Sequence, residues 1–257
     1  LIGVLTAGGP STCGTEIVLR IGVRENAVIL RDMDPATGAM AEQAKYDPAT
    51  GPAPEPIARA LGAEETRLRV AMAEGVTSWQ VVDALGRADF LKGEVARPPA
   101  EGSLAPDTYD VARGSARADL LAEMARRQSA ILADAWDRRE SGLPYRSPGE
   151  ALVMASIIEK ETGLPEERGL VASVFVNRLR AGMRLETDPA VIYGITGGKA
   201  VLERGIRMSE LRRRTPYNTY LVDGLPPTPI ANPGRAAIEA ALHPEPSDYL
   251  FFVADGG

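Results

Sequence analysis

LVMASIIEKETGLPEERGLVASVFVNRLRAGMRLETDPAVIYG, residues 152–194, is the most informative stretch of this 257-residue chain. It places an acid, Glu161, at the end of an otherwise apolar helical pattern, and the polar pairs Asn177-Arg178 and Thr187-Asp188 follow. A carboxyl group held among apolar neighbours keeps its proton to higher pH than a solvated one. Breaking an acetal bond requires a proton donor of this kind. The stretch therefore predicts an enzyme that cuts a polysaccharide, with its acid on a helix.

Two helices are predicted within and around this stretch. The first begins at Ser147, a residue suited to an N-cap, with Pro148 at the first helical position, and it runs to Glu161. The second runs from Pro165 to about residue 180. Hydrophobic spacing predicts further helices over 79–85, 116–140, 209–214 and from residue 232 to before Pro244, and strands over 16–22, 27–31, 67–72, 219–222 and 249–254. The predicted fold class is α+β.

Three segments are expected along the chain. Residues 1–65 are β-rich and show no evident chemistry, residues 66–103 form a small β/α module, and residues 104–257 form a mixed α+β domain with a helical centre. In the module, Thr77 to Gln80 has the pattern of a capping box that opens a helix. Trp79 at its start either packs the helix onto the preceding strand or presents its ring to a sugar.

Composition excludes several classes of site. A formal net charge of −6 disfavours a nucleic-acid binder, which needs concentrated Lys and Arg. The single cysteine, Cys13, excludes an internal disulfide and a cysteine-clustered zinc site, and the single histidine, His243, disfavours a catalytic triad or a histidine metal site. No metal and no cofactor are expected. No apolar run reaches the roughly 20 residues that span a bilayer. Carboxylates remain as the natural catalytic groups.

Helical spacing distinguishes Glu159 from Glu161. Two residues apart on a helix, they point about 200° apart and cannot form a facing pair. Glu161 shares a face with Met154, Ile157 and Ile158, and it lies in the last turn, where the helix dipole also disfavours a charged carboxylate. Glu161 is therefore the predicted acid, and Glu159 is a supporting residue for Arg178 or Lys160. The alternative is that Glu-Lys-Glu is a solvated helix end.

Polar and aromatic residues are dense in the forty or so residues that follow the acid. Amides and carboxylates bind sugar hydroxyls, and aromatic faces stack on pyranose rings. Each such residue alone is as consistent with a turn or a cap. Together the candidates for substrate binding are Asn177, Arg178, Thr187, Asp188, Tyr193, Tyr217, Asn218, Thr219 and Tyr220.

Three runs resemble one known family. ALVMASIIEKETGLPEERGLVASVFVNRLRAGMRLETDPAVIYG, TPYNTYLVDGLPPTPIANPG and YLFFVADG are similar to segments of the YceG-like proteins, the endolytic murein transglycosylases. EGVTSWQVVDAL resembles the LysM-like module that precedes the catalytic domain in that family. The resemblance covers about residues 65–257, and residues 1–65 match only weakly.

The resemblance implies cleavage of nascent peptidoglycan within the glycan strand, by a lyase without a cofactor. The second Glu of the family's E-K-E-T motif falls on Glu161. Members lie on the outer face of the inner membrane through one N-terminal helix, and peptidoglycan synthases are expected partners. This chain is expected to be the extracytoplasmic part, facing the periplasm, and to lack site residues that members carry beyond Gly257.

One carboxyl group suffices for the implied mechanism. Glu161 as acid would protonate the oxygen between N-acetylmuramic acid and N-acetylglucosamine, the substrate's N-acetyl group would meet the charge, and the ionised Glu161 would take the proton of the C6 hydroxyl. A 1,6-anhydro ring then closes, with Asn177 or Asp188 expected to hold the N-acetyl group. A muramidase-type hydrolase is an alternative and would need Asp188 or Glu186 as a second carboxylate. A non-catalytic peptidoglycan-binding protein is another.

Overall fold

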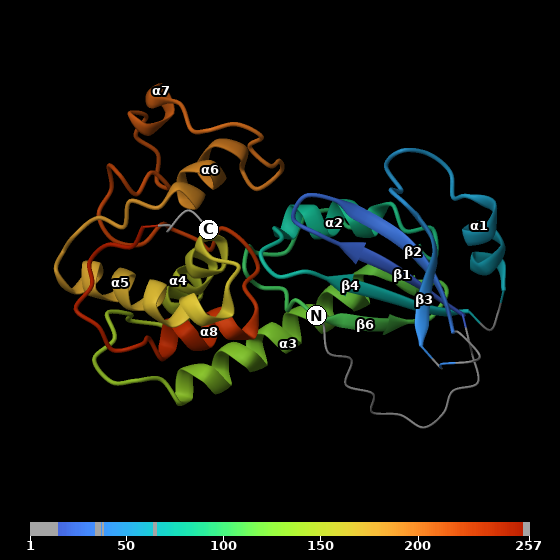
Figure 1. The fold of residues 1–257 in the computed structure, drawn as a ribbon, viewed down its shortest axis with the longest axis horizontal. Coiled ribbons are helices and arrows are strands. Elements are labelled where there is room, and N and C mark those ends of the chain that lie inside the picture. Colours follow the sequence, from blue (N-terminus) through green and yellow to red (C-terminus); the bar gives the residue numbers. More distant parts are fainter. Residues whose placement is uncertain (1–14, 34–36, 38, 64–65, 254–257) are drawn as a thin grey trace.

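The computed structural model describes residues 15–33, 37, 39–63 and 66–253. They form two lobes joined by one long helix, α3 (Arg117–Asp137). The N-terminal lobe holds the sheet, and the C-terminal lobe is built from helices and long irregular segments (Figure 1). The predicted α+β class is confirmed. None of the helices in the described ranges is both long enough and apolar enough to cross a membrane.

The N-terminal lobe is organised by a five-stranded sheet with the order β3-β2-β1-β4-β6. Its central strand β1 (Thr15–Ile21) pairs antiparallel with β2 (Asn26–Met33) and parallel with β4 (Arg67–Met72). The outer strands are β3 (Met40–Tyr46) beside β2 and β6 (Thr108–Val111) beside β4. β1 alternates so that Ile17, Leu19 and Ile21 are fully buried on the helix-covered side.

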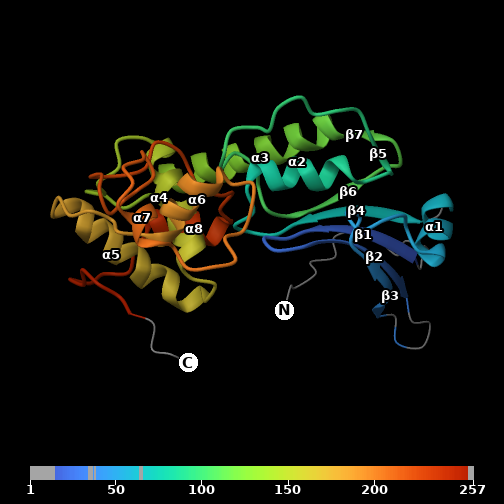
Figure 2. The same cartoon turned by 90° about the horizontal axis from the view of Figure 1, so that it is seen from above.

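Two helices cover one face of this sheet, as Figure 2 shows: α2 (Ser78–Gly86) and the first half of α3. Val81 and Leu85 of α2 and Leu121 and Met124 of α3 share one core with the strands. The predicted capping box at the start of α2 is confirmed, because Thr77 accepts from the Gln80 N–H and Gln80 accepts from the Thr77 N–H. A small parallel pair, β5 (Leu91–Lys92) and β7 (Ser115–Ala116), and the short helix α1 (Glu55–Gly62) complete the lobe.

The sheet crosses the expected segment boundaries at residues 65/66 and 103/104. β1 and β2 of the first segment, β4 of the second and β6 of the third are neighbours in one sheet. They also share one core, which includes Leu104 and Tyr109. We therefore propose a single N-terminal unit that extends into α3, in place of a separate β-rich region and module.

The C-terminal lobe is organised around α4 (Pro148–Glu161), in which Ala151 and all of 153–158 are buried. Its start is as predicted, since Ser147 caps the helix by accepting from the Glu150 N–H and Pro148 is the first helical residue. The helices α5 (Arg168–Arg180), α6 (Asp188–Thr196) and α8 (Arg235–Leu242) pack against α4, as does the second half of α3. A 3-10 turn (Pro165–Glu167) precedes α5, and α7 (Met208–Leu211) is one short turn.

Two predicted strands are wrong, and two helices went unpredicted. Residues 219–222 form turns, because the buried Asn218 side chain bonds the carbonyls of residues 210, 211 and 213 and folds the chain back on itself. Residues 249–253 are irregular, with Phe251 65% exposed, so the expected buried strand there is absent, and residue 254 lies outside the described residues. The helix expected over 209–214 is limited to α7, while α1 and α6 form where no helix was predicted.

The lobes meet at a buried asparagine, Asn232, whose side chain is 0% exposed. Its backbone exchanges hydrogen bonds with Gly75 N and Val76 O, both at 2.9 Å. Its side-chain oxygen accepts from Leu104 N at 2.9 Å, and its amide donates to Val76 O at 3.0 Å. Close approach also requires Gly102, which has φ +80° and would bring a Cβ to 2.7 Å from Pro229. The helix predicted from residue 232 begins later, because Gly234 is the N-cap of α8.

Candidate active site

Glu161 is the last residue of α4, as predicted, and its side chain is half-buried. Burial raises the pKa of its carboxyl group, and the negative charge of Asp188 adds to that shift. The Thr187 hydroxyl donates a hydrogen bond to Glu161 Oε1, which opposes the shift and lowers the pKa in part. No ion pair to Glu161 is present among the described residues. The group is therefore arranged to remain protonated at higher pH than an exposed Glu.

A cavity of about 230 Å³ opens beside Glu161. Phe175 and Leu185 give it apolar walls, while Asp188 and Tyr220 give it polar ones. Tyr220 Oη donates to Asp188 Oδ1 at 2.8 Å, so the ring and the carboxylate form one wall. The predicted site residues Arg178, Asp188 and Tyr220 line this cavity, and Thr187 contacts the acid directly.

The loop that brings Thr187 to the acid is held on two sides. Arg178, buried in α5, donates from Nη1 to the carbonyl oxygens of Arg184 at 3.2 Å and Leu185 at 3.0 Å. On the other side Thr219 Oγ1 accepts from Thr187 N at 2.9 Å and donates to Thr187 O at 3.2 Å. The buried Thr219 thus fixes the backbone of the residue that orients the acid.

Glu186 is the strained residue of this loop. Its φ of +52° makes it the non-glycine residue with positive φ among the described residues, a conformation that costs on the order of 1 kcal/mol. Its N–H donates to Thr219 O at 3.2 Å, and its carboxylate lies 3.2 Å from Arg178 Nη1 while remaining 45% exposed. Its carboxylate joins those of Glu161 and Asp188 among the residues that line the cavity.

Glu159 has a different environment from Glu161. Its side chain is only 5% exposed, lies 3.5 Å from Arg168 Nη2 and accepts from Gly234 N at 2.9 Å. Burial raises the pKa of Glu159 as well. A position among apolar residues therefore does not distinguish Glu161 from Glu159. The separation comes from access and partners, because Glu161 lines a cavity while Glu159 is bonded between α5 and the start of α8. The arginine that contacts Glu159 is Arg168, whereas the sequence predicted Arg178 or Lys160 as its partner.

Asn177 and Arg178 hold the chain after α8. Asn177 Nδ2 donates to Ser247 O at 2.8 Å and to Tyr249 O at 3.0 Å, and Arg178 Nε donates to Leu250 O at 2.7 Å. This anchoring brings Phe252 into edge contact with Phe175, with ring centroids 5.7 Å apart, at the wall of the cavity. Asn177 itself does not line the cavity. Phe252, which the sequence placed in a strand, is a site residue that the pattern missed.

Three other predicted binding residues lie away from the acid. Asn218 is buried and bonds its own loop. Tyr193 and Tyr217 pack against each other with ring centroids 5.0 Å apart. Tyr193 Oη then donates to Glu101 Oε2 at 3.2 Å, and Tyr217 Oη bonds Thr228 Oγ1 at 2.8 Å. Of the three, Tyr193 lies at the junction of the lobes, where it contacts Glu101.

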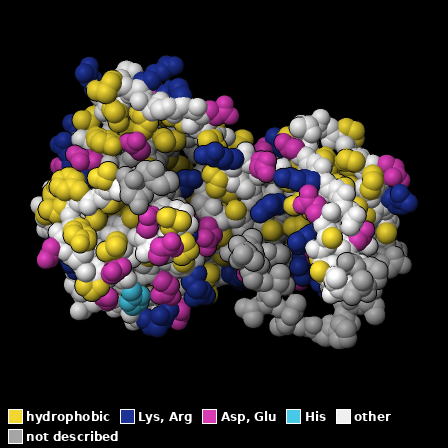
Figure 3. Space-filling view, in the orientation of Figure 1, with side chains coloured by type: hydrophobic (Ala, Val, Ile, Leu, Met, Phe, Trp, Pro, Cys, Tyr) yellow, Lys and Arg dark blue, Asp and Glu magenta, His cyan; other side chains and the backbone are white. Residues whose placement is uncertain are grey.

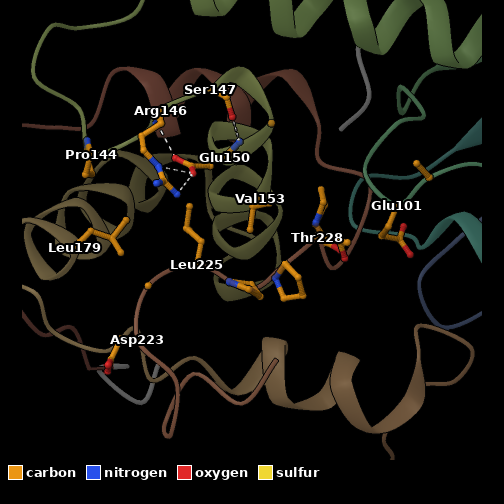
Figure 4. A pocket seen from close by; sticks show the side chains of 16 residues that line it. Glu101, Pro144, Arg146, Ser147, Glu150, Val153, Leu179, Asp223, Leu225 and Thr228 are labelled. Atoms are coloured by element: carbon orange, nitrogen blue, oxygen red, sulfur yellow. Dashed lines mark hydrogen bonds and ion pairs between the residues drawn. The ribbon is translucent and has the colours of Figure 1, made fainter. Parts of the chain in front are cut away.

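A larger cavity, about 780 Å³, lies along the first half of α4 (Figure 4). Val153, the lining residue of α4 that is nearest to Glu161 in sequence, precedes it by about 12 Å along the helix axis, and Glu161 does not line this cavity. Arg146 and Glu150 are ion-paired at its wall, and Glu101 lies at its far side from Leu179. Burial raises the pKa of Glu101, although Ser78 N donates to its carboxylate at 2.8 Å. Glu101 is thus a third desolvated carboxyl group, one that the sequence did not indicate.

Trp79 is half-buried at the start of α2, and among the described residues neither hydrophobic core includes it. Its role in binding sugar stays a prediction. Within the described ranges, no group of three or more His, Cys, Asp or Glu side chains is placed to hold a metal ion.

The fold and site together define a two-lobed α+β protein with one accessible, desolvated acid at a helix end. The profile of the YceG-like family matches residues 21–257, and the chain belongs to that family. The crystal structure of a YceG-like protein from Listeria monocytogenes is similar, with a TM-score of 0.61 and 31% identity over 73% of this chain and 70% of that one.

Two relatives carry the name endolytic murein transglycosylase. The protein of Bacillus subtilis strain 168 is 48% identical over 103 residues, which are 40% of this chain. That of Streptococcus pneumoniae strain D39 is 34% identical over 167 residues, which are 64% of this chain. The matched segments span 28% and 30% of the lengths of these relatives.

Proposed function

We propose that this protein is an endolytic lytic transglycosylase that cleaves the β-1,4 bond between N-acetylmuramic acid and N-acetylglucosamine within peptidoglycan strands. The observation that carries the proposal is the environment of Glu161: a desolvated carboxyl group, bonded by one hydroxyl, at the wall of an open cavity. The names of the two relatives support the same activity.

In the proposed mechanism, protonated Glu161 donates to the bridging oxygen as the bond breaks. The N-acetyl group of the substrate meets the positive charge that develops on the sugar carbon. The Thr187 hydroxyl then stabilises the ionised Glu161, which takes the proton of the C6 hydroxyl as the 1,6-anhydro ring closes. Asp188 and Tyr220 form the wall that orients the sugar, and Phe252 offers a partly exposed ring for stacking. Neither water nor a cofactor is consumed.

We place the protein, by its resemblance to the family, at the outer face of the inner membrane beside peptidoglycan synthases. Nascent glycan strands are the proposed substrate in this location. Fractionation of cells that produce the whole protein tests this placement.

A muramidase-type hydrolase is the second candidate, and Glu186 favours it. Its strained backbone puts a carboxylate at the same cavity as Glu161. A hydrolase uses such a second carboxylate to activate water or to stabilise the sugar cation. The ion pair with Arg178 fixes this carboxylate but also offsets its charge.

The test is mass spectrometry of the products released from purified peptidoglycan strands. Ends bearing 1,6-anhydro-N-acetylmuramic acid support the transglycosylase, and reducing ends would replace it with the hydrolase. Glu186→Gln and Asp188→Asn give the matched controls: both should leave the chemical identity of a transglycosylase product unchanged, and one of them should disable a hydrolase. Absence of any cleavage would leave a glycan-binding protein.

A further inference from the structure

A second cavity lies at the seam where the two lobes meet. It has a volume of about 270 Å³, and we refer to it as the junction pocket. The N-terminal lobe contributes Arg24 from the β1–β2 turn, with Thr77 and Gln80 from the start of α2. The C-terminal lobe contributes Lys160 from α4 and one side of α6. Figure 3 shows the molecule narrowing at this seam, with Lys and Arg side chains near it.

The junction pocket is next to the cavity of the acid. Consecutive residues on two helices divide between the two spaces: Lys160 and Pro189 line the junction pocket, while Glu161 and Asp188 line the other. Only the ends of α4 and α6 therefore separate the two cavities. A ligand that occupied both cavities would pass these two helix ends.

Lys160 is a half-buried cation without a carboxylate partner in the part of the chain that is described. Its Nζ donates to Gly75 O at 3.3 Å. The neighbouring Glu159 is bonded to Arg168 and Gly234. Burial lowers the pKa of Lys160, the negative charge of Glu159 opposes that shift, and the positive charge of Arg24 adds to it. Glu159 offsets only part of the cost of burying this ammonium group, because the pKa of Lys160 stays lowered, so an anion bound directly to Lys160 would stabilise it further.

Arg24 adds a second positive charge to the same pocket. It is exposed and forms no ion pair among the described residues. No Asp or Glu lines the junction pocket, although the chain as a whole has a net charge of −6. Two cations without an acid define a site for an anion.

The remaining walls limit the kind of anion. Thr77 Oγ1 donates to Gly198 O, Thr196 Oγ1 donates to Ile192 O, and Gln80 Nε2 donates to Val23 O, so these polar groups already have partners. The rest of the lining is apolar, including Ile192, Leu202 and Ile230. The volume is at the small end for ligand pockets. These features fit a carboxylate on a short aliphatic chain better than a phosphate or a sugar.

We propose that the junction pocket binds a free carboxylate of the peptide attached to the glycan, with Lys160 and Arg24 as its ligands. The proposal rests on the function proposed above, because the muramic acid beside the acid cavity carries that peptide. The short aliphatic side chains of the peptide would pack on the apolar wall. The pocket would then select strands that still carry their peptides.

The test measures binding apart from cleavage. Calorimetry with the synthetic tripeptide Ala-γ-Glu-Lys, which has free carboxylates, should show binding to the wild-type protein and to Glu161→Gln. The same tripeptide with its carboxylates amidated should bind at least about tenfold more weakly, the loss expected for one charge-assisted contact. Lys160→Met and Arg24→Met should lose the same factor, and Lys92→Met, on exposed β5, should lose nothing.

The melting temperature of Lys160→Met should equal or exceed that of the wild-type protein, because burial disfavours the charged ammonium group more than the charge of Glu159 favours it. If that variant fails to fold, Arg24→Met on the exposed turn carries the test. Equal binding of free and amidated tripeptide, absence of binding at millimolar concentration, or unchanged affinity in Arg24→Met would each overturn the proposal. If the protein cleaves strands but binds free and amidated tripeptide equally, the proposed pocket is wrong and the proposed function stands. If it binds the free tripeptide selectively but cleaves no strands, the pocket stands and the proposed function is wrong.

Discussion

The Thr187 hydroxyl donates its hydrogen bond to Oε1 of Glu161, and the backbone of Thr187 is itself held on both sides by Thr219. Thr219 is 0% exposed, so the loop position of Thr187 is set from within the core. Asp188, the next residue, opposes Thr187 in its effect on the acid: its charge raises the pKa of Glu161, whereas the hydroxyl lowers it. Two adjacent residues therefore tune one carboxyl group in opposite directions.

The cleavage rate should fall at alkaline pH as Glu161 loses its proton, and we call this fall the alkaline limb of the pH–rate profile. Replacing Thr187 with Val should move the alkaline limb to higher pH. The substitution keeps the volume and removes the donor that stabilises ionised Glu161, so the pKa of the acid rises further. The maximal rate should also fall by about 10²-fold, because the acid loses the group that orients it. Thr187→Ser should restore both values. A limb that stays in place would show that this hydrogen bond does not tune the acid.

The Asp188→Asn variant should shift the alkaline limb the other way, to lower pH. It removes a negative charge that raises the pKa of Glu161. Tyr220→Phe is the matched control, since it removes the hydrogen bond to Asp188 and leaves the charge. Rates at saturating glycan concentration across the pH range measure both shifts. Shifts of the same sign in Asp188→Asn and Thr187→Val would contradict the opposed roles.

Stability should depend on pH through Glu101. Its pKa is raised in the folded state by burial, so the stability it contributes is complete below the unfolded pKa of about 4.3 and is lost as pH rises through the folded value. Glu101→Gln should therefore reduce the fall in the free energy of unfolding between pH 4 and pH 7. Urea denaturation at several pH values measures this fall. An unchanged slope would mean that Glu101 titrates as an exposed group.

Asn232→Ala should destabilise the junction of the lobes by about 3 kcal/mol. The change leaves the buried Leu104 N–H without its acceptor and removes the amide that donates to Val76 O. Chemical denaturation gives the loss, and Asn177→Ala, whose bonds hold only the segment after α8, is a control outside the junction. A loss below about 1 kcal/mol would show that the contact is dispensable.

Local patterns predicted the parts of the fold that depend on neighbouring residues. Ser147-Pro148 and Thr77-Gln80 start α4 and α2 as expected, because caps use groups within one turn. The strands predicted over 219–222 and 249–253 are wrong because both stretches are continuous runs of β-branched, aromatic and apolar residues, which are typical of strands. Side-chain hydrogen bonds from Asn218, Asn177 and Arg178 decide their conformation instead.

Of the candidate site, the sequence predicted the position of Glu161 on its helix but not most of the residues around it. Helical spacing placed Glu161 at the end of α4, but it did not separate Glu161 from the equally desolvated Glu159. Spacing also did not distinguish polar residues that support loops from residues that line the cavity. Glu101 and Phe252 reach their cavities from distant segments, and no spacing signal connects them to Glu161. The parallel pairing of β1 with β4 was likewise invisible, because it joins segments separated by α1.

The most direct test of Glu161 as the working acid compares three isosteric variants on peptidoglycan strands. The measured quantity is the rate at which new glycan ends form in Glu161→Gln, Glu159→Gln and Glu101→Gln, each with its fold checked by circular dichroism. We expect Glu161→Gln to lose at least about 10³-fold, the upper range for general acid catalysis, and the other two variants to retain most activity. Comparable losses in Glu161→Gln and either of the other variants, or an active Glu161→Gln protein, would contradict the assignment of Glu161.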